Sequence, residues 1–265
     1  MPRRTFNGNI SNSLSEEQAY ALYNEMAPTV GRLTIKYNSK KDKDENINED
    51  SDEDIDEGTD EDIDKDTNED SAKHGTGVVI DDEGFALTLY ELVSKTGSSI
   101  FISFDGSEEQ YEAKICKSEE LKRQKLALIK VELKNGNLLE SANISEDEIF
   151  VGQDIFCIQN AFPSKGLGYQ ISYVSSLLRN FNDIDRLFRD QFLECDMETN
   201  VIQTGNLGLC SSEDSLEAGR GAPLFDSGGN VMGLLAFEYN RYDFAIHCQK
   251  EKILFAIEEA KRASV

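Results

Sequence analysis

Residues 75–88 read GTGVVIDDEGFALT, and this stretch decides the fold class of the chain. Two short apolar runs, residues 77–80 and 85–89, flank the turn residues Asp81, Asp82, Glu83 and Gly84. Short strands rich in β-branched and aromatic residues, joined by a turn that contains Asp and Gly, are typical of a β-hairpin. The stretch therefore predicts antiparallel β-structure.

Similar runs lie on both sides of this hairpin. They cover residues 29–37, 99–104, 111–115, 126–131, 155–158, 169–176, 231–237 and 244–247. Residues 105–107 and 135–137 carry the Asp, Asn and Gly of further hairpin loops. Many short strands at this spacing predict an all-β sandwich or barrel, and 265 residues are enough for two barrels.

Two helices are predicted at the ends of this series. Ser15 followed by Glu16, Glu17 and Gln18 suits an N-cap with an acidic first turn, which opens a helix through about Met26. Residues 250–262 carry a single apolar stripe, as an amphipathic helix does.

The negative charge of the chain is concentrated in one segment. The formal net charge is −24, and residues 42–70 hold seventeen acidic residues and two lysines, a net of −15. This segment has no aromatic residue, and its few apolar residues cannot offset the entropy of ordering it. We predict a disordered acidic loop at about 40–73, and we expect no attraction to nucleic acid or to anionic membranes.

The sequence contains few residues that could form a metal or cofactor site. The five cysteines include no Cys-x-x-Cys pair, and His74 and His247 are the only histidines. The acidic segment also lacks Gly at the sixth position that a calcium-binding EF-hand loop requires. We expect no cofactor and no metal.

The N-terminal stretch carries no targeting signal that we can identify. Residues 1–14 have no apolar segment of the kind found in secretory signals, and we interpret them as a flexible tail. No apolar run approaches the roughly 18 residues of a spanning helix. We expect a protein inside the cell, in the cytoplasm or nucleus, with an organelle left open.

The order of these segments resembles the protease module of the Do-like (HtrA) serine proteases, which have the trypsin fold of two six-stranded β-barrels. Collinear matches run from about Glu16 to Ile257, and the most characteristic are residues 75–88, 111–115, 126–130, 151–162, 172–176, 222–226, 231–234 and 244–246. The resemblance implies an N-terminal barrel at 15–150, and a C-terminal barrel with the terminal helix at 151–265. No segment that resembles a PDZ domain follows.

The resemblance also identifies the positions of a catalytic triad, and all three are substituted. Residues 88–93 match the family's Thr-Asn-Ala-His-Val-Val, which places Glu91 at the base position. Lys125 replaces the orienting Asp of Asp-Ile-Ala-Leu-Ile-Lys. Residues 218–224 match Gly-Asn-Ser-Gly-Gly-Pro-Leu, so Arg220 replaces the nucleophile, and Ala218 and Gly219 stand in the oxyanion region. We expect Glu91, Lys125 and Arg220 to form a fixed ion pair or triad.

One serine and the two histidines need separate interpretation. Asp226, Ser227, Gly228 and Gly229 copy the letters of the trypsin nucleophile motif, but they occupy the place of a hairpin turn. We interpret them as that turn, and the two histidines as structural or exposed.

Three hypotheses of function follow. The favoured one is a trypsin-like pseudoprotease, a non-catalytic homologue that binds a protein or peptide. An active serine endopeptidase would need a different alignment at all three triad positions, or an unusual dyad that uses Ser227 or another serine. A binder of basic proteins would work mainly through the acidic loop, by charge attraction. The sequence does not indicate an oligomeric state.

Overall fold

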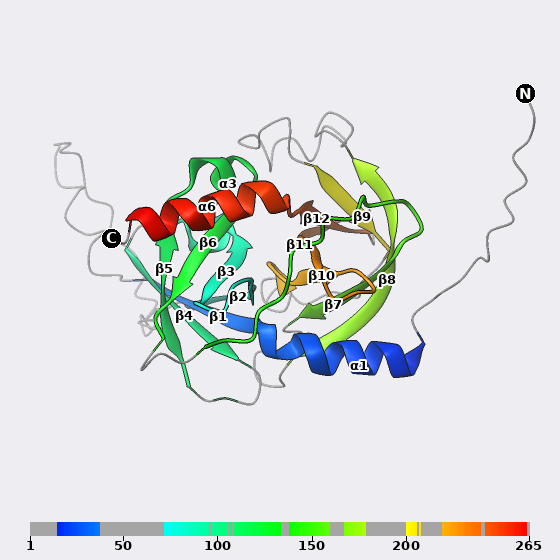
Figure 1. Cartoon of the computed structure of the whole chain (residues 1–265), viewed down its shortest axis with the longest axis horizontal. Helices are drawn as coiled ribbons and strands as arrows, with labels where there is room; N and C mark the ends of the chain where they lie inside the picture. The colour runs from blue at the N-terminus through cyan, green and yellow to red at the C-terminus, as the bar shows by residue number, and fades with distance from the viewer. Residues whose placement is uncertain are drawn as a thin grey trace, which may run out of the picture.

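Two closed antiparallel β-barrels follow one another along the chain (Figure 1). The computed structural model describes residues 15–37, 72–95, 97–104, 107, 109–133, 138–159, 167–178, 200–205, 207, 219–239 and 242–263. Each barrel has six strands within these residues. The all-β double-barrel fold, with a short N-terminal helix and a C-terminal helix, is confirmed.

The first barrel closes in the strand order β1-β2-β3-β6-β5-β4. Its strands are β1 (Val30–Tyr37), β2 (Ala72–Val79), β3 (Phe85–Leu89), β4 (Ser98–Phe104), β5 (Tyr111–Cys116) and β6 (Leu126–Val131). In β1 the side chains of Leu33 and Ile35 are fully buried, whereas Arg32 and Thr34 between them are partly exposed. This alternation fills the barrel interior with branched aliphatic side chains.

The second barrel closes in the strand order β10-β11-β12-β9-β8-β7. Its strands are β7 (Asp154–Gln159), β8 (Gly168–Leu178), β9 (Val201–Thr204), β10 (Pro223–Phe225), β11 (Val231–Tyr239) and β12 (Tyr242–His247). A separate apolar cluster fills part of its interior, and Ile155, Cys157, Leu224, Leu235 and Ala245 are fully buried members of it.

The N-terminal helix packs against the second barrel, although it directly precedes the first (Figure 1). α1 (Glu16–Met26) begins with a capping box between Ser15 and Gln18 and continues into the 3₁₀ turn η1 (Ala27–Thr29). Met26 lies against Gly229 in the β10–β11 turn, and the ring of Tyr23 lies 5.3 Å from that of Tyr169 on β8.

The C-terminal helix makes the reverse crossing and packs on the first barrel (Figure 1). α6 (Lys250–Ala263) contacts β6 and the short helix α3 (Glu119–Arg123), where Lys252 forms an ion pair with Glu120. Near its end, Lys261 pairs with Asp81 and Glu83 in the β2–β3 turn. The two terminal helices therefore tie the barrels to each other.

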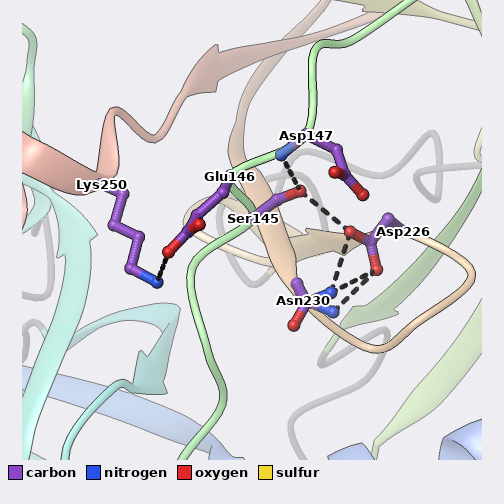
Figure 2. A network of polar contacts seen from close by, with 6 residues as sticks. All are labelled: Ser145, Glu146, Asp147, Asp226, Asn230 and Lys250. Atoms are coloured by element: carbon purple, nitrogen blue, oxygen red, sulfur yellow. Dashed lines mark hydrogen bonds and ion pairs between the residues drawn. The ribbon is translucent and has the colours of Figure 1, made fainter.

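The segment between the barrels is held by one buried carboxylate. Asp226, 4% exposed, accepts hydrogen bonds from the backbone N–H groups of Gly228 and Asn230 and from the Ser145 hydroxyl (Figure 2). Asn143 and Ser145 also bond through their backbones to Val231, at the start of β11. These bonds fix the point at which the connecting segment meets the second barrel.

The backbones of the two barrels are in direct contact at the turn before β10. The carbonyl of Arg220 accepts from the N–H of Thr76 on β2 at 2.8 Å. The next residue, Gly221, has a φ of +84°, and a Cβ there would lie 2.2 Å from the Thr76 carbonyl oxygen. Only glycine fits at this position, because both the backbone conformation and the contact exclude a side chain.

The structure corrects several boundaries. The turn predicted at 135–137 joins no hairpin, because the described strands on either side, β6 and β7, belong to different barrels. Its residues lie outside those described, as do the N-terminal tail 1–14 and residues 40–71 of the acidic loop. Ala72 and Lys73, assigned to that loop, belong to β2. The short helices α3 and α2 (Tyr90–Val93) were not predicted.

None of the described helices is both long enough and apolar enough to cross a bilayer.

We predict that Gly221→Ala lowers the free energy of unfolding by about 3 kcal/mol, because strain and a backbone clash add. Gly152→Ala is the matched control. Gly152 also has a positive φ, +89°, but nothing lies within 4 Å of a Cβ built there, so the cost should be about 1 kcal/mol. Urea unfolding of both variants measures the difference. Equal losses would show that the Thr76 contact is easily relaxed.

Candidate functional site

Glu91 and Arg220 meet where the two barrels face each other. Glu91 lies in α2, a single helical turn directly after β3. Arg220 lies in the turn before β10, held to the first barrel by its own carbonyl. Arg220 Nη2 donates to Glu91 Oε1 in an ion pair between residues 129 positions apart. The structure therefore brings together two of the three positions that the sequence aligns with a triad.

The backbone holds Arg220 at this position. The N–H of Gly221 donates to the Leu235 carbonyl on β11, and the N–H of Ala222 donates to the Gly219 carbonyl. On the first barrel, the Thr88 hydroxyl donates to the same Thr76 carbonyl that Gly221 approaches. The guanidinium is thus presented by a fixed turn, and it remains accessible, with 32% of the Arg220 side chain and 41% of the Glu91 side chain exposed.

Lys125, the third position, is joined to this site through its backbone. It directly follows the cap of α3, where its φ of +61° is unusual for a residue with a side chain. Its carbonyl accepts from the N–H of Tyr90, which begins α2. The left-handed turn at Lys125 therefore helps to position the helix that carries Glu91.

The oxyanion region is only partly described. Gly219 is buried in the turn before Arg220, whereas Ala218 lies outside the described residues.

The Ser227 motif forms a turn, as predicted. Residues 226–229 join β10 to β11, and the N–H of Gly229 donates to the Asp226 carbonyl at 3.1 Å. Ser227 is exposed at the tip, on the side of the second barrel that α1 covers. It is therefore not part of the Glu91–Arg220 site.

Both histidines lie on strands. His74 is on β2 opposite Thr34, and His247 is on β12 opposite Gly233. Partial burial lowers the pKa of His247, since the charged imidazolium is poorly solvated there. Neither histidine hydrogen-bonds Glu91 or Arg220 among the contacts of the described residues.

A model of a known family matches this chain. The model is described as trypsin-like peptidase domain, and it matches residues 75–234. The chain belongs to the trypsin-like peptidases. Among solved structures, the crystal structure of Deg5 is similar, with a TM-score of 0.57, 20% sequence identity and 92% of each chain covered. No curated protein sequence matches the chain.

In this trypsin-like peptidase the guanidinium of Arg220 and the carboxylate of Glu91 are in contact at the inter-barrel site. Among the described residues, no group of three His, Cys, Asp or Glu side chains is placed to hold a metal ion. The arrangement presents charged, partly exposed hydrogen-bonding groups at the junction of the two barrels.

One buried acidic residue of this trypsin-like domain was not predicted. Asp243 on β12 is fully buried, and its Oδ2 accepts from the N–H of Leu207 at 2.5 Å, while Oδ1 has no partner. Burial raises its pKa to about 6, the Leu207 N–H partly opposes this, and Glu238 adds to it. Asp243 fixes the chain where it leaves β9 toward Arg220. The only sign of it in the sequence is an acidic residue directly before the apolar run that begins at Phe244.

Asp243 should make stability depend on pH. Its pKa rises from 3.8 to about 6 on folding, so the folded state binds the proton more tightly than the unfolded state. The contribution of Asp243 to the free energy of unfolding therefore falls as the pH rises from about 4 to about 6, by at most about 3 kcal/mol.

Asp243→Asn tests this pH dependence, because the amide keeps an acceptor for Leu207 and removes the charge. We expect the stability of the variant relative to wild type to increase across this pH range, measured by thermal unfolding. Glu112→Gln, at an exposed carboxylate on β5, should keep the wild-type profile. A parallel shift of the Asp243→Asn curve at every pH would contradict the prediction.

We further predict that the Glu91–Arg220 pair contributes little to stability. Both side chains are partly exposed, and such pairs couple by about 1 kcal/mol or less. A double-mutant cycle with Glu91→Gln and Arg220→Gln measures the coupling by urea unfolding. The Lys252–Glu120 pair has similar exposure, 30% and 38%, and serves as the control cycle. A much larger coupling at Glu91–Arg220 would show that the pair fastens the barrels together.

Proposed function

We propose that the chain is a Do-like pseudoprotease, a trypsin-like domain that binds protein or peptide without cleaving it. One observation carries the proposal: the positions aligned with nucleophile and base hold Arg220 and Glu91, and these form an ion pair. The Do-like resemblance of the sequence, and the similarity to the Deg5 structure, support the placement of these positions.

The chemistry of the pair disfavours proteolysis. Cleavage in this family needs a hydroxyl whose proton is taken by an imidazole, which a carboxylate orients. Arginine remains protonated at neutral pH and has no lone pair to attack a carbonyl carbon. Glu91 already accepts a hydrogen bond from Arg220, so its carboxylate is engaged with a cation rather than a nucleophile.

Peptide binding does not need the triad. A peptide that adds to a sheet is held mainly by backbone hydrogen bonds, and its side chains enter neighbouring pockets. β11 pairs with β10 from Val231 to Leu234, and Leu235 bonds through its backbone to Gly221 and Ala222 just before β10. Beyond Leu235, from Phe237 to Tyr239, the described strand that pairs with β11 is β12. We propose that an extended segment lies along this part of β11, next to the turn that carries Arg220.

One sample tests both halves of the proposal. Fluorescently labelled casein reports binding by polarisation and cleavage by the release of small fragments, and a fluorophosphonate probe labels any activated serine. We expect casein to bind, to stay intact, and no serine to be labelled in a folded sample. Labelling of any serine in the wild type, or the lack of casein binding, would overturn the proposal.

A matched variant shows whether the substitutions are the cause. In Glu91→His/Lys125→Asp/Arg220→Ser all three family residues are restored, and we expect it to gain fluorophosphonate labelling that wild type lacks. Ser227→Ala in the same background should not remove that labelling, because Ser227 lies in the β10–β11 turn. If the triple variant does not fold, Glu91→His/Arg220→Ser, which restores the hydroxyl and its imidazole base, provides the comparison after a folding check by thermal unfolding.

A further inference from the structure

A cavity on the second barrel is separate from the Glu91–Arg220 site. It has a volume of about 240 Å³ and lies between the connecting segment and three strand ends. Its walls are formed by Asp147, Glu148, Ile149, Leu177, Asn200, Val201, Ile202 and His247. Neither Glu91 nor Arg220 is among them, so a ligand in this cavity would contact a different set of residues.

The inner wall of the cavity is apolar. Val201 and Ile202, at the start of β9, are 2% and 1% exposed. Ile149 and Leu177 are partly buried and pack against the apolar cluster of the second barrel. An aliphatic chain placed in the cavity would therefore contact side chains that belong to the barrel core, and it would be removed from water.

The outer wall carries two carboxylates that have no ion-pair partner among the described residues. Glu146, Asp147 and Glu148 are consecutive, and Lys250 pairs with Glu146 alone (Figure 2). Among the described residues no cation pairs with Asp147 or Glu148, and both are exposed. Within the described part of the chain, two unpaired carboxylates thus border an apolar cavity.

These carboxylates project from a fixed backbone. The N–H of Asp147 donates to the Ser145 hydroxyl, which donates to Asp226, and Asn230 bonds the same carboxylate (Figure 2). Because the segment is already held in place, a ligand would not have to order it on binding.

His247 is the other titratable group that lines the cavity. Burial lowers the pKa of its imidazole, which is therefore neutral at neutral pH and does not repel a cation. The imidazole and the Asn200 amide are available as further hydrogen-bonding groups.

We propose that this cavity binds a lysine or arginine side chain of a partner protein. The aliphatic stem lies on Ile149, Leu177 and Ile202, and the charged head meets Asp147 and Glu148. Long basic side chains have this division between an apolar stem and a charged end. The cavity does not include Glu91 or Arg220. It therefore extends the proposed function with a second contact, which prefers basic segments.

Short capped peptides test the cavity directly on the full-length protein. The probes are Ac-Gly-Lys-Gly-NH2 and its norleucine counterpart, which has the same stem without the charge. Amide resonances of Asn200 and His247 are followed by NMR during titration. We expect saturable shifts at these residues with the lysine peptide, and binding at least tenfold weaker with the norleucine peptide, since the carboxylates would then have no partner. Rising salt should weaken only the lysine peptide.

Variants separate the cavity from the general negative charge of the chain. Asp147→Asn/Glu148→Gln should weaken the lysine peptide about tenfold and leave the norleucine peptide unchanged. Glu112→Gln/Glu251→Gln removes the same charge at exposed sites on β5 and α6, and it should bind as wild type does. Equal binding of both peptides, unsaturable shifts, or equal losses in both double variants would overturn the proposal. Serine labelling, the test of the pseudoprotease, does not affect this result.

Discussion

The close approach of two backbones at Gly221 is the constraint on which this structure depends. A left-handed glycine against the Thr76 carbonyl lets the turn before β10 dock onto the first barrel. That docking allows Arg220 to accept from Thr76 through its carbonyl and to direct its side chain toward Glu91. The inter-barrel site therefore exists because one position has no side chain.

The trypsin-like fold holds a pair of opposite charges where its two barrels meet. The turn before β10 and the single-turn helix α2 bring Arg220 and Glu91 into contact there. The scaffold and the chemistry are separable, because the barrels are stabilised by their apolar interiors and the Glu91–Arg220 pair is partly exposed.

The sequence predicted the strands well because alternation and turn residues are local signals. The contact between Glu91 and Arg220 was also predictable, since both positions lie next to segments that resemble a known family. The burial of Asp243 was not, because it depends on how β12 lies over Leu207. The hairpin predicted at 135–137 was wrong for the same reason. Turn residues indicate where a chain bends, but they do not indicate which strands then pair. The cavity beside Asp147 joins four distant segments and has no local pattern.

The crossed helices have a consequence for how the chain is made. A ribosome releases the first barrel long before α6, yet that helix covers β6 and α3 and places Lys261 beside the β2–β3 turn. During translation the surface of β6 and α3 that α6 covers therefore stays exposed until α6 is made. Likewise, α1 has no barrel to pack against until the second barrel is made. α6 completes the packing of the half of the protein that is synthesised first, so the first barrel reaches its native packing only after the second barrel has been made.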